Sequence, residues 1–468
     1  MSDAEVVNQE QLSGDIASPI ELSFAPDDHH GIERSRRLRK SVFSALLTRP
    51  LAAVISFASI PLFTKYLGAE RYGLYEAIIA FSIWLALSNA GITAGLVNKL
   101  TDCHVADDRL LARRYISSTW FGMVGFVILL CLIALVATPL IHWQWLFPAK
   151  SRLARAEVPW VVGVTILLTF VSLLAQIPAS TYAAYQELDR NNYWDGASKV
   201  ATLAACCAVV YTPFGLVGVA LVMLAVPTFV RLLNTVYLFW IEKPWLRPSA
   251  ALFDAKLLGK TFHEGISIFV LQMAAVGIFQ SDKLIITKVL GSDANAGFSV
   301  ILRLFLMAYG VYSLLLAPLW PAYGEASRRG DFRWIQRKLN QSLLLGCGIM
   351  LSCGAIMFFF GDPIIRRLSR GELPSASKPV IIGITAMFVV RVCTECQSIL
   401  LNAAGILNPQ MLVLGVNAVL NLIVGVIFAR KFGLVGVAWS FPLTALLTSV
   451  WAYPWLIRRH FNSFLDRA

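Results

Sequence analysis

The sequence Phe214-Gly-Leu-Val-Gly-Val-Ala220 recurs unchanged as Phe432-Gly-Leu-Val-Gly-Val-Ala438, 218 residues further along the chain. A second pair, Thr64-Lys-Tyr-Leu-Gly68 and Thr287-Lys-Val-Leu-Gly291, lies at an offset of 223. One apolar heptapeptide could repeat by chance in so apolar a chain, but a second pair in the same order and at nearly the same offset argues against chance. A fixed period of this kind indicates an ancient duplication. The sequence therefore predicts two similar halves of about 220 residues.

The composition places both halves in a membrane. The 468 residues are 57% hydrophobic and only 15% charged, and the mean hydropathy is +0.66. Soluble domains are about 45–50% apolar and about 25% charged. This excludes a soluble enzyme, a disordered scaffold and a secreted disulfide-rich protein. Most of the eight cysteines lie in apolar runs, and Cys393-Thr-Glu-Cys396 lacks the βαβ context of a redox motif, so we expect no redox or metal role.

Crossing about 30 Å of hydrocarbon takes about 20 apolar residues. Twelve segments fit, of which the fifth is the shortest: Val42–Thr64, Leu74–Val97, Tyr115–Ile141, Val158–Thr181, Ala197–Tyr211, Phe214–Trp240, Phe262–Ile285, Ala296–Pro318, Asn340–Phe360, Pro379–Leu401, Pro409–Ala429 and Gly433–Ile457. We therefore expect an all-α polytopic membrane protein of about twelve transmembrane helices. Its two six-helix lobes would occupy residues 42–240 and 262–457, joined by a cytoplasmic linker at 241–261.

Basic residues indicate the orientation. With the N-terminus in the cytoplasm, 23 of the 40 lysines and arginines lie in cytoplasmic segments and 13 in outer loops. This bias predicts that both termini are cytoplasmic. Two lobes of six spans then have the same orientation, which makes them a parallel repeat. Transporters built from such repeats hold their substrate between the halves, near the middle of the membrane.

Residues 1–41 are predicted to form a cytoplasmic tail, as are residues 458–468. Positions 1–33 contain eight acidic and no basic residues, which is typical of a disordered segment. The cluster Arg34-Ser-Arg-Arg-Leu-Arg-Lys40 follows, directly before the first span, and indicates an anchor at lipid headgroups. Its position against a membrane segment argues against the rival interpretation, nucleic-acid binding.

Four arginines lie inside the expected spans: Arg49, Arg231, Arg303 and Arg391. An arginine at a helix centre costs roughly 2.5–3.5 kcal/mol on insertion scales, so it persists where it faces a partner or a watery cavity. We expect Arg303, Arg49 and Arg391 to line a lumen that binds an anionic substrate. The alternative for each arginine is a buried structural pair or a side chain that reaches the membrane surface, which suits Arg231 best.

Three further residues are candidates for ion coupling or for an ion pair: Glu395, Asp282 and Lys283. Glu395 follows Arg391 at the i, i+4 spacing, so the two share a helix face and Glu395 could neutralise the arginine. Asp282 and Lys283 are adjacent near the outer end of the seventh span. An ion pair between them at the membrane interface is the simpler interpretation.

No catalytic, cofactor or metal motif is found. Gly259-Lys-Thr261 resembles the end of a phosphate-binding loop, but the position of its first glycine is occupied by Asp254. A polytopic polysaccharide polymerase would need a long catalytic outer loop, and the outer loops are short. A cation-coupled small-molecule or multidrug exporter would need carboxylates deep in the spans. Glu395 alone lies deep, with Glu76 and Asp282 near the outer boundary, against four arginines, so the balance favours an anion-binding lumen. With no catalytic motif and only short outer loops, we expect no enzyme activity.

Several stretches carry a family resemblance: Ile60–Gly68, Tyr72–Tyr75, Asn89–Ile92 with Asn98, Leu401–Gly405, Asn417–Asn421 and Phe432–Ala438. Together they resemble the bacterial polysaccharide flippases, which are the O-antigen and exopolysaccharide translocases of the multidrug/oligosaccharidyl-lipid/polysaccharide exporter superfamily. The resemblance covers essentially all of Val42–Ile457. Its motifs concern helix packing and turns rather than chemistry.

The resemblance implies two six-helix lobes forming a V and alternating access. It implies transfer of an undecaprenyl-diphosphate-linked oligosaccharide from the inner to the outer leaflet of the bacterial inner membrane, for lipopolysaccharide O-antigen, exopolysaccharide or capsule. It also implies a cationic lumen with an arginine in span eight, which Arg303 matches by its span; Arg49 and Arg391 match less closely. The implied partners are the lipid-linked glycan and the bilayer, with the polymerase and glycosyltransferases of the same pathway, and no nucleic acid.

Overall fold

The computed structural model describes residues 29–89, 91–316, 319–329, 331–369, 371–373 and 377–465. These residues form helices and connecting turns, without a strand among them, so the expected all-α fold is confirmed. The acidic segment before His29 lies outside them, so its predicted disorder stays a prediction. The side chain of Arg49 also lies outside the described part of the chain.

The first lobe contains seven α-helices within the described residues: α1 (His29–Ala86), α2 (Ile92–Val105), α3 (Arg109–Leu140), α4 (Arg152–Leu174), α5 (Ile177–Ala184), α6 (Leu188–Val209) and α7 (Gly215–Tyr237). The second lobe contains α8 (Ala255–Phe279), α9 (Ser281–Val289), α10 (Ser292–Leu316), α11 (Leu319–Arg329), α12 (Phe332–Leu368), α13 (Lys378–Ala403), α14 (Leu407–Leu447) and α15 (Ser449–Leu465). Short turns of helix at Leu87–Asn89, Trp143–Trp145, Leu238–Glu242, Pro244–Leu246 and Ala250–Leu252 complete the order.

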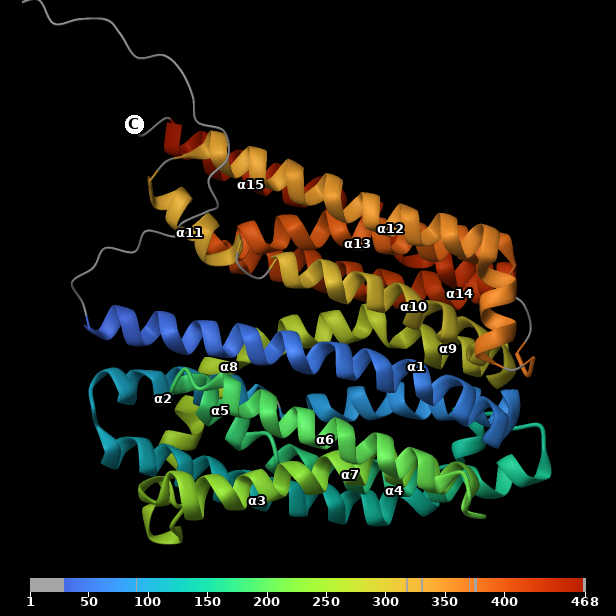
Figure 1. Cartoon of the computed structure of the whole chain (residues 1–468), viewed down its shortest axis with the longest axis horizontal. Helices are drawn as coiled ribbons and strands as arrows, with labels where there is room; N and C mark the ends of the chain where they lie inside the picture. The colour runs from blue at the N-terminus through green and yellow to red at the C-terminus, as the bar shows by residue number, and fades with distance from the viewer. Residues whose placement is uncertain are drawn as a thin grey trace, which may run out of the picture.

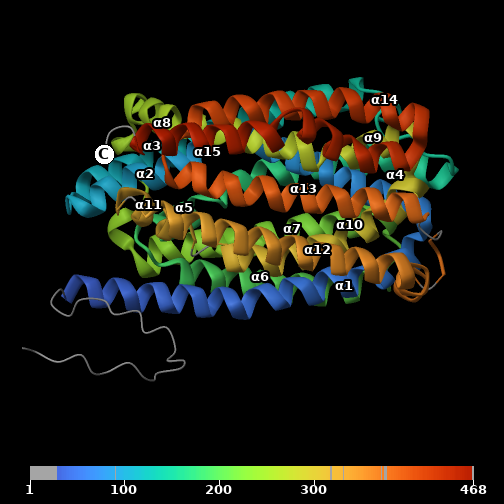
Figure 2. The same ribbon diagram turned by 90° about the horizontal axis from the view of Figure 1, so that it is seen from above.

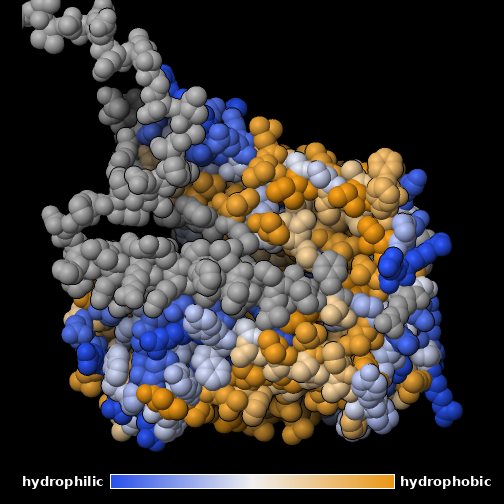
Figure 3. All heavy atoms as spheres, in the orientation of Figure 1, coloured by the Kyte–Doolittle hydropathy of each residue, from blue (hydrophilic) through white to orange (hydrophobic). Residues whose placement is uncertain are grey.

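The long helices lie roughly side by side, and the two lobes stack along their length (Figures 1 and 2). On the face shown in Figure 3, hydrophobic residues cover much of the middle and hydrophilic ones gather toward the two helix ends. Large apolar side chains face outward, among them Leu135, Trp160 and Phe359, each 73% exposed. Such a surface suits hydrocarbon rather than water, because soluble proteins rarely expose large contiguous apolar patches.

Among the described residues, eight helices are long and apolar enough to cross a membrane, or nine if the bent pair Ala58–Asn89 and Ile92–Val105 is one span. Some of these helices contain two expected spans. In α1, for example, the chain reverses its direction at Gly68. The rings of Phe63 and Tyr75 lie 5.6 Å apart, although twelve residues of straight helix would separate them by about 18 Å. The expected number of twelve spans stays a prediction.

The same reversal occurs inside α14 at Gly433. A Cβ atom on Gly436 would lie 2.2 Å from the carbonyl oxygen of Phe428, whereas eight residues of straight helix span about 12 Å. Gly433 has a positive φ of 62°, and its duplicate Gly215 has 54°. The glycines of the other repeated peptide, Gly68 and Gly291, have φ of 73° and 98°. Both repeated peptides therefore end or begin a span at a glycine-specific turn, which explains why they are alike.

We expect the change Gly433→Ala to destabilise the protein by about 1–3 kcal/mol, because its φ of 62° and ψ of −142° suit only glycine. No atom lies within 4 Å of the added Cβ, so the cost is purely conformational. The matched control is Gly415→Ala in the same helix, which also has open space and should gain about 0.5–1 kcal/mol. Thermal unfolding in detergent measures both changes, and equal melting temperatures would contradict the assignment of the turn.

Several boundaries differ from those expected. Helix α1 begins at His29, so the basic cluster that was assigned to the tail has a helical backbone continuous with the first span. The segment expected to be a loop between the eighth and ninth spans, residues 319–339, contains the helix α11 and the first turns of α12. The fifth expected span lies largely in the 22-residue helix α6, which is about 33 Å long but is not among the eight helices of the described residues that are apolar enough to cross a membrane.

The linker between the lobes is shorter than expected, because α8 already begins at Ala255. It is fixed on α3, where Ser117 and Ser118 accept hydrogen bonds from the backbone nitrogens of Ser249 and Asp254 at 3.1 and 2.9 Å. The carboxylate of Asp254 caps α8 by accepting a hydrogen bond from the backbone nitrogen of Lys256. This explains why an aspartate occupies the position that a phosphate-binding loop would give to glycine.

Candidate functional site: an ion cluster between the lobes

A buried carboxylate from the first lobe meets two cations from the second lobe. Glu76 lies in α1, after the reversal at Gly68, and is 1% exposed. Its Oε2 accepts a hydrogen bond from Lys283 Nζ of α9 at 2.7 Å, and its Oε1 forms an ion pair with Arg303 of α10. An ionised carboxylate in an apolar interior persists only when it is paired in this way.

Two hydroxyl groups complete this arrangement. The Tyr72 hydroxyl, one turn before Glu76 in α1, donates to Glu76 Oε1 at 3.1 Å. The guanidinium of Arg303 donates to Ser59 Oγ at 3.1 Å, from the other arm of the α1 hairpin. We call Ser59, Tyr72, Glu76, Lys283 and Arg303 the inter-lobe cluster. With one acidic and two basic side chains, it carries a formal charge of +1.

The cluster belongs to a larger contact at one end of the molecule, which we call the turn end because Gly68, Gly215 and Gly291 lie there. Gly73 approaches Ser292 so closely that a Cβ on it would lie 1.7 Å from the Ser292 carbonyl oxygen. Asn295 Nδ2 donates to the Gly73 carbonyl oxygen at 2.8 Å. The lobes are therefore packed backbone to backbone within one turn of Glu76.

Two lysines add ionic contacts between the lobes at the same end. Lys150 Nζ lies 2.8 Å from Asp293 Oδ2, and this hydrogen bond raises the pKa of the lysine above its ordinary value. Lys288 of α9 lies 3.9 Å from the centre of the Trp145 ring and donates to the Trp145 carbonyl oxygen. Both pairs are exposed, so each contributes little free energy on its own.

The other end, which we call the linker end, has its own contact between the lobes, made by α2 and α8. Gly91 and Gly265 meet backbone to backbone, because a Cβ on Gly91 would lie 2.2 Å from the Gly265 carbonyl oxygen. Lys99 Nζ and Glu264 Oε1 form an ion pair at 2.7 Å.

Arg391 of α13 lies among aromatic rings. Its guanidinium carbon is 3.8 Å from the centre of the Phe279 ring and 4.2 Å from that of Tyr309, which makes two cation–π contacts. The ion pair expected with Glu395 is not among the ion pairs of the described residues, and Arg391 Nε is buried without a hydrogen-bond partner there. The sequence spacing therefore identified an unusual arginine but not its neighbours.

The ion pair expected between Asp282 and Lys283 is not among the ion pairs of the described residues, and Lys283 pairs with Glu76 instead. Lys283 points across to Glu76 of the other lobe, whereas Asp282 is 1% exposed and neither of its carboxylate oxygens has a partner among the described residues. Arg231 follows its simpler interpretation, because it is 44% exposed on its side chain and pairs with Asp195 at 3.3 Å.

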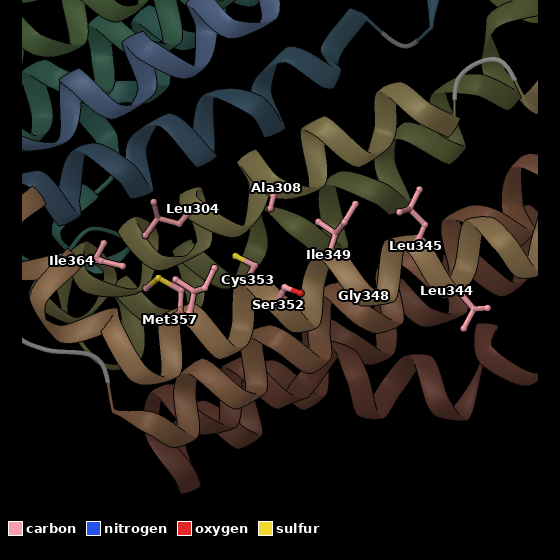
Figure 4. Close-up of a pocket in the computed structure, with 11 residues that line it drawn as sticks. Leu304, Ala308, Leu344, Leu345, Gly348, Ile349, Ser352, Cys353, Met357 and Ile364 are labelled. Atoms are coloured by element: carbon pink, nitrogen blue, oxygen red, sulfur yellow. The ribbon is translucent and has the colours of Figure 1, made fainter. Parts of the chain in front are cut away.

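A groove of about 650 Å³ lies between α10 and α12 (Figure 4). Its lining is almost entirely apolar and comes from Leu304, Ala308, Leu344, Leu345, Gly348, Ile349, Ser352, Cys353, Ile356, Met357 and Ile364. Such a lining offers nothing to hold a charged or sugar group. The groove is therefore not a second site for an anion.

Sequence reasoning missed Ser59 and Tyr72, and it noted Glu76 only as a carboxylate close to the outer boundary. Glu76 and Arg303 are 227 residues apart, so no helical spacing relates them. The signal that was present is charge balance: a buried arginine needs an acid, and few acids lie in the spans. This signal indicates that a partner exists, but it does not identify the partner.

Comparison with known sequences gives two family matches. The profile of the family described as polysaccharide biosynthesis protein matches residues 38–326, and that of the MatE family matches residues 268–427. A protein named as an O-antigen transporter in Salmonella typhimurium is 20% identical over 419 residues, covering 88% of this chain and 94% of that protein. A protein named as an O-antigen export protein in Yersinia pseudotuberculosis is 21% identical over 443 residues, covering 91% and 95%.

Solved structures share the fold at low identity. An inward-facing multidrug resistance MATE transporter of the MOP superfamily aligns with a TM-score of 0.76 at 13% identity, over 91% of this chain and 99% of that one. An outward-facing MATE structure aligns with a TM-score of 0.62 at 13% identity, over 92% and 97%. The lipid II flippase MurJ in an inward closed conformation gives 0.67 at 14% identity, over 89% and 87%. The fold is therefore the duplicated two-lobe architecture of these transporters.

Proposed function

The chain belongs to the family of polysaccharide biosynthesis proteins, and on this premise we propose that it is a flippase for an undecaprenyl-diphosphate-linked oligosaccharide. It would carry this lipid from the inner to the outer leaflet of a bacterial inner membrane, for O-antigen, exopolysaccharide or capsule synthesis. The chain is a multi-pass membrane protein of transporter fold. The names of its relatives, which refer to O-antigen transport and export, support a polysaccharide substrate.

One observation carries the proposal: two cations of one lobe hold a carboxylate of the other lobe inside the membrane. Arg303 and Lys283 are the groups that a diphosphate would need, since guanidinium and ammonium groups donate charge-assisted hydrogen bonds to phosphate oxygens. Glu76 occupies them in this conformation. A diphosphate bound in place of Glu76 would break the ion pairs that Glu76 forms between the lobes. Binding of the substrate would then itself favour the change from one conformation to the other.

Alternating access follows from the two ends. At the turn end the lobes are joined by the inter-lobe cluster and by the contact of Gly73 with Ser292. We take the turn end as the outer side and the linker end as the cytoplasmic side, following the distribution of basic residues. The TM-score is higher for the inward-facing transporter structure than for the outward-facing one, which supports a conformation closed to the outside. The structure then represents the state closed to the outside.

The other arginines would serve the sugar. In this proposal Arg391, which lies against the rings of Phe279 and Tyr309, contacts acidic or hydroxyl groups of the glycan, and Arg49 lines the lumen nearer the cytoplasm. The lipid chain would stay in the bilayer through a lateral opening. The polymerase and glycosyltransferases of the same pathway are the expected partners. Glu395 and Asp282 remain the candidates for ion coupling, whereas Lys283 pairs with Glu76.

Deletion of the gene should cause lipid-linked glycan to accumulate in the inner leaflet, because translocation would stop after synthesis. The measurement is the fraction of undecaprenyl-linked glycan accessible from the outer side, together with the amount of finished polysaccharide at the cell surface. Complementation with the wild-type gene is the control. Normal outward flux of glycan in the deletion strain would disprove the flippase function.

The second candidate is a cation-coupled small-molecule or multidrug exporter. The MatE profile match over residues 268–427 and the TM-score of 0.76 to a MATE transporter favour it. The same deletion strain separates the two functions. If the protein is an exporter, its deletion should increase drug sensitivity and leave the glycan unchanged. If it is a flippase, its deletion should cause lipid-linked glycan to accumulate and leave drug sensitivity unchanged.

A further inference from the structure

Two cysteines of the second lobe meet across a helix interface. Cys347 of α12 and Cys393 of α13 are 46 residues apart in the sequence, and their Sγ atoms lie 3.9 Å apart. The sequence argument against a redox role concerned Cys393 together with Cys396, which share one helix. The structure instead places Cys393 against a thiol of another helix, and both of these side chains are half-buried.

The packing of α12 against α13 holds the two thiols in register. A Cβ on Gly346 would lie 2.6 Å from Val392 Cγ1, and a Cβ on Gly354 would lie 2.5 Å from Thr385 Cγ2. The contact thus moves forward along α12 as it moves back along α13, as antiparallel helices require, and the glycines let the two backbones approach closely. The two cysteines are the residues that follow Gly346 and Val392 in the sequence. Backbone packing therefore brings them together.

Two other cysteines of these helices have different neighbours. Cys353 lies six residues after Cys347, about 120° around α12, and it lines the groove between α10 and α12 (Figure 4). Cys396 Sγ lies 2.7 Å from the Tyr312 hydroxyl of α10. Both of these thiols therefore lie on the side of α10, whereas Cys347 and Cys393 contact each other. Cys353 is also half-buried, which makes it a matched control.

A cysteine in an apolar interior ordinarily acts as a small apolar residue, and a fully buried thiol is inert. Two features distinguish this pair. Both thiols are half-buried, so a small uncharged oxidant can reach them, and each can react with the oxidised form of the other. A disulfide has a sulfur–sulfur distance of about 2.05 Å, so the two Sγ atoms, now 3.9 Å apart, must approach through rotation of their side chains.

We propose that Cys347 and Cys393 are a peroxide-sensitive thiol pair, which oxidation converts into a reversible disulfide between α12 and α13. One thiol, as its thiolate, attacks hydrogen peroxide, so that the O–O bond breaks and a sulfenic acid forms. The released hydroxide takes up the proton of that thiol and leaves as water. The second thiol attacks the sulfenic sulfur, the S–S bond forms, and a second water leaves. Both sulfur atoms are oxidised, the two peroxide oxygens are reduced, and a dithiol reverses the reaction.

The disulfide joins two helices of the same lobe. It fixes α13 against α12 close to Arg391, which lies two residues before Cys393 in the same helix. The link therefore restrains the interior of the second lobe and leaves the contacts between the lobes unchanged. This property goes beyond transport, because it makes the second lobe a target of oxidants whatever the protein carries.

The test treats the purified full-length protein with hydrogen peroxide, blocks the remaining thiols, digests the protein with trypsin and analyses the peptides by mass spectrometry. Arg366 and Arg367 lie between the two cysteines, so trypsin separates their segments unless a disulfide links them. We expect one linked pair of peptides, lighter by two hydrogen atoms than the two free peptides, which dithiothreitol separates. The linked pair should be absent in Cys347→Ser and retained in the control Cys353→Ser.

Thermal unfolding provides a second measurement. Peroxide should raise the melting temperature of the wild type and of Cys353→Ser, because a cross-link restricts the unfolded chain, and should leave that of Cys347→Ser unchanged. If Cys347→Ser cannot be purified, Cys393→Ser replaces it. Linked peptides that contain Cys353 or Cys396 in comparable yield, or sulfinic acids at Cys347 and Cys393 without a link, overturn the proposal. Neither measurement requires a glycan, so the outcome is independent of the proposed flippase function.

Discussion

Arg303→Ala is expected to reduce outward glycan flux by about two orders of magnitude or more, with the protein still present in the membrane. Truncation of one partner of a buried, hydrogen-bonded charge pair between a protein and its ligand costs about 2–5 kcal/mol of binding free energy, and each 1.4 kcal/mol corresponds to about tenfold in binding. The fold should survive because Lys283 still neutralises Glu76 at 2.7 Å. The measurement is surface polysaccharide at matched protein levels in a complemented deletion strain.

Two controls make this result specific. Arg231→Ala removes an arginine that is 44% exposed and paired with Asp195 at the surface, so it should leave the flux within about twofold, since such pairs contribute about 0–1 kcal/mol. Arg303→Lys keeps the charge but loses the planar, multidentate donor set, and should retain only part of the flux. Wild-type flux in Arg303→Ala would remove Arg303 from the site.

Glu76→Gln separates substrate binding from a purely structural pair. If Arg303 and Lys283 bind the diphosphate, the loss of the competing carboxylate should strengthen binding of undecaprenyl diphosphate to the purified protein, whereas Arg303→Ala should weaken it. If the cluster only joins the lobes, both variants should lose stability and neither should change the affinity. Opposite signs of the two affinity changes therefore support the site.

The fold was largely predictable because its signals are local. Span length and composition predict helices in a bilayer, and the repeated peptides predict the duplication. The structure adds the reason for the repeats, since Gly68, Gly291, Gly215 and Gly433 all have positive φ at turns between helices. The boundaries were less predictable. The first residues of α1, from His29 onward, and the helix α11 are rich in polar residues, so hydropathy assigns both segments to loops.

The site was only half predictable. The cost of an arginine in a membrane identified Arg303 and Arg391 from the sequence, because that cost depends on the residue and not on its neighbours. The partners depend on packing between distant segments. Spacing along one helix suggested pairs of Arg391 with Glu395 and of Asp282 with Lys283. In the structure Arg391 lies on aromatic rings, and Lys283 reaches Glu76 in the other lobe.

Gly73→Ala should disrupt the contact between the lobes as strongly as a charge change in the cluster. An alanine in a helix is ordinarily about 0.5–1 kcal/mol better than glycine. Here the new Cβ would lie 1.7 Å from the Ser292 carbonyl oxygen, a backbone atom that no side-chain rotation can remove. The two backbones must separate, at the typical cost of overpacking of about 1–3 kcal/mol. The clash therefore outweighs the gain in helix propensity.

The separation should also remove the hydrogen bond from Asn295 Nδ2 to the Gly73 carbonyl oxygen and displace Glu76, one turn away, from Lys283 and Arg303. We expect a longer distance than in the wild type between spin labels attached at the exposed positions Arg152 and Lys431, one in each lobe at the turn end, with glycan flux lost because the turn end cannot close. The matched control is Gly310→Ala in α10, where the Cβ meets open space. It should leave both the distance and the flux unchanged. If Gly73→Ala kept the wild-type distance, backbone contact between Gly73 and Ser292 would not be what closes the turn end.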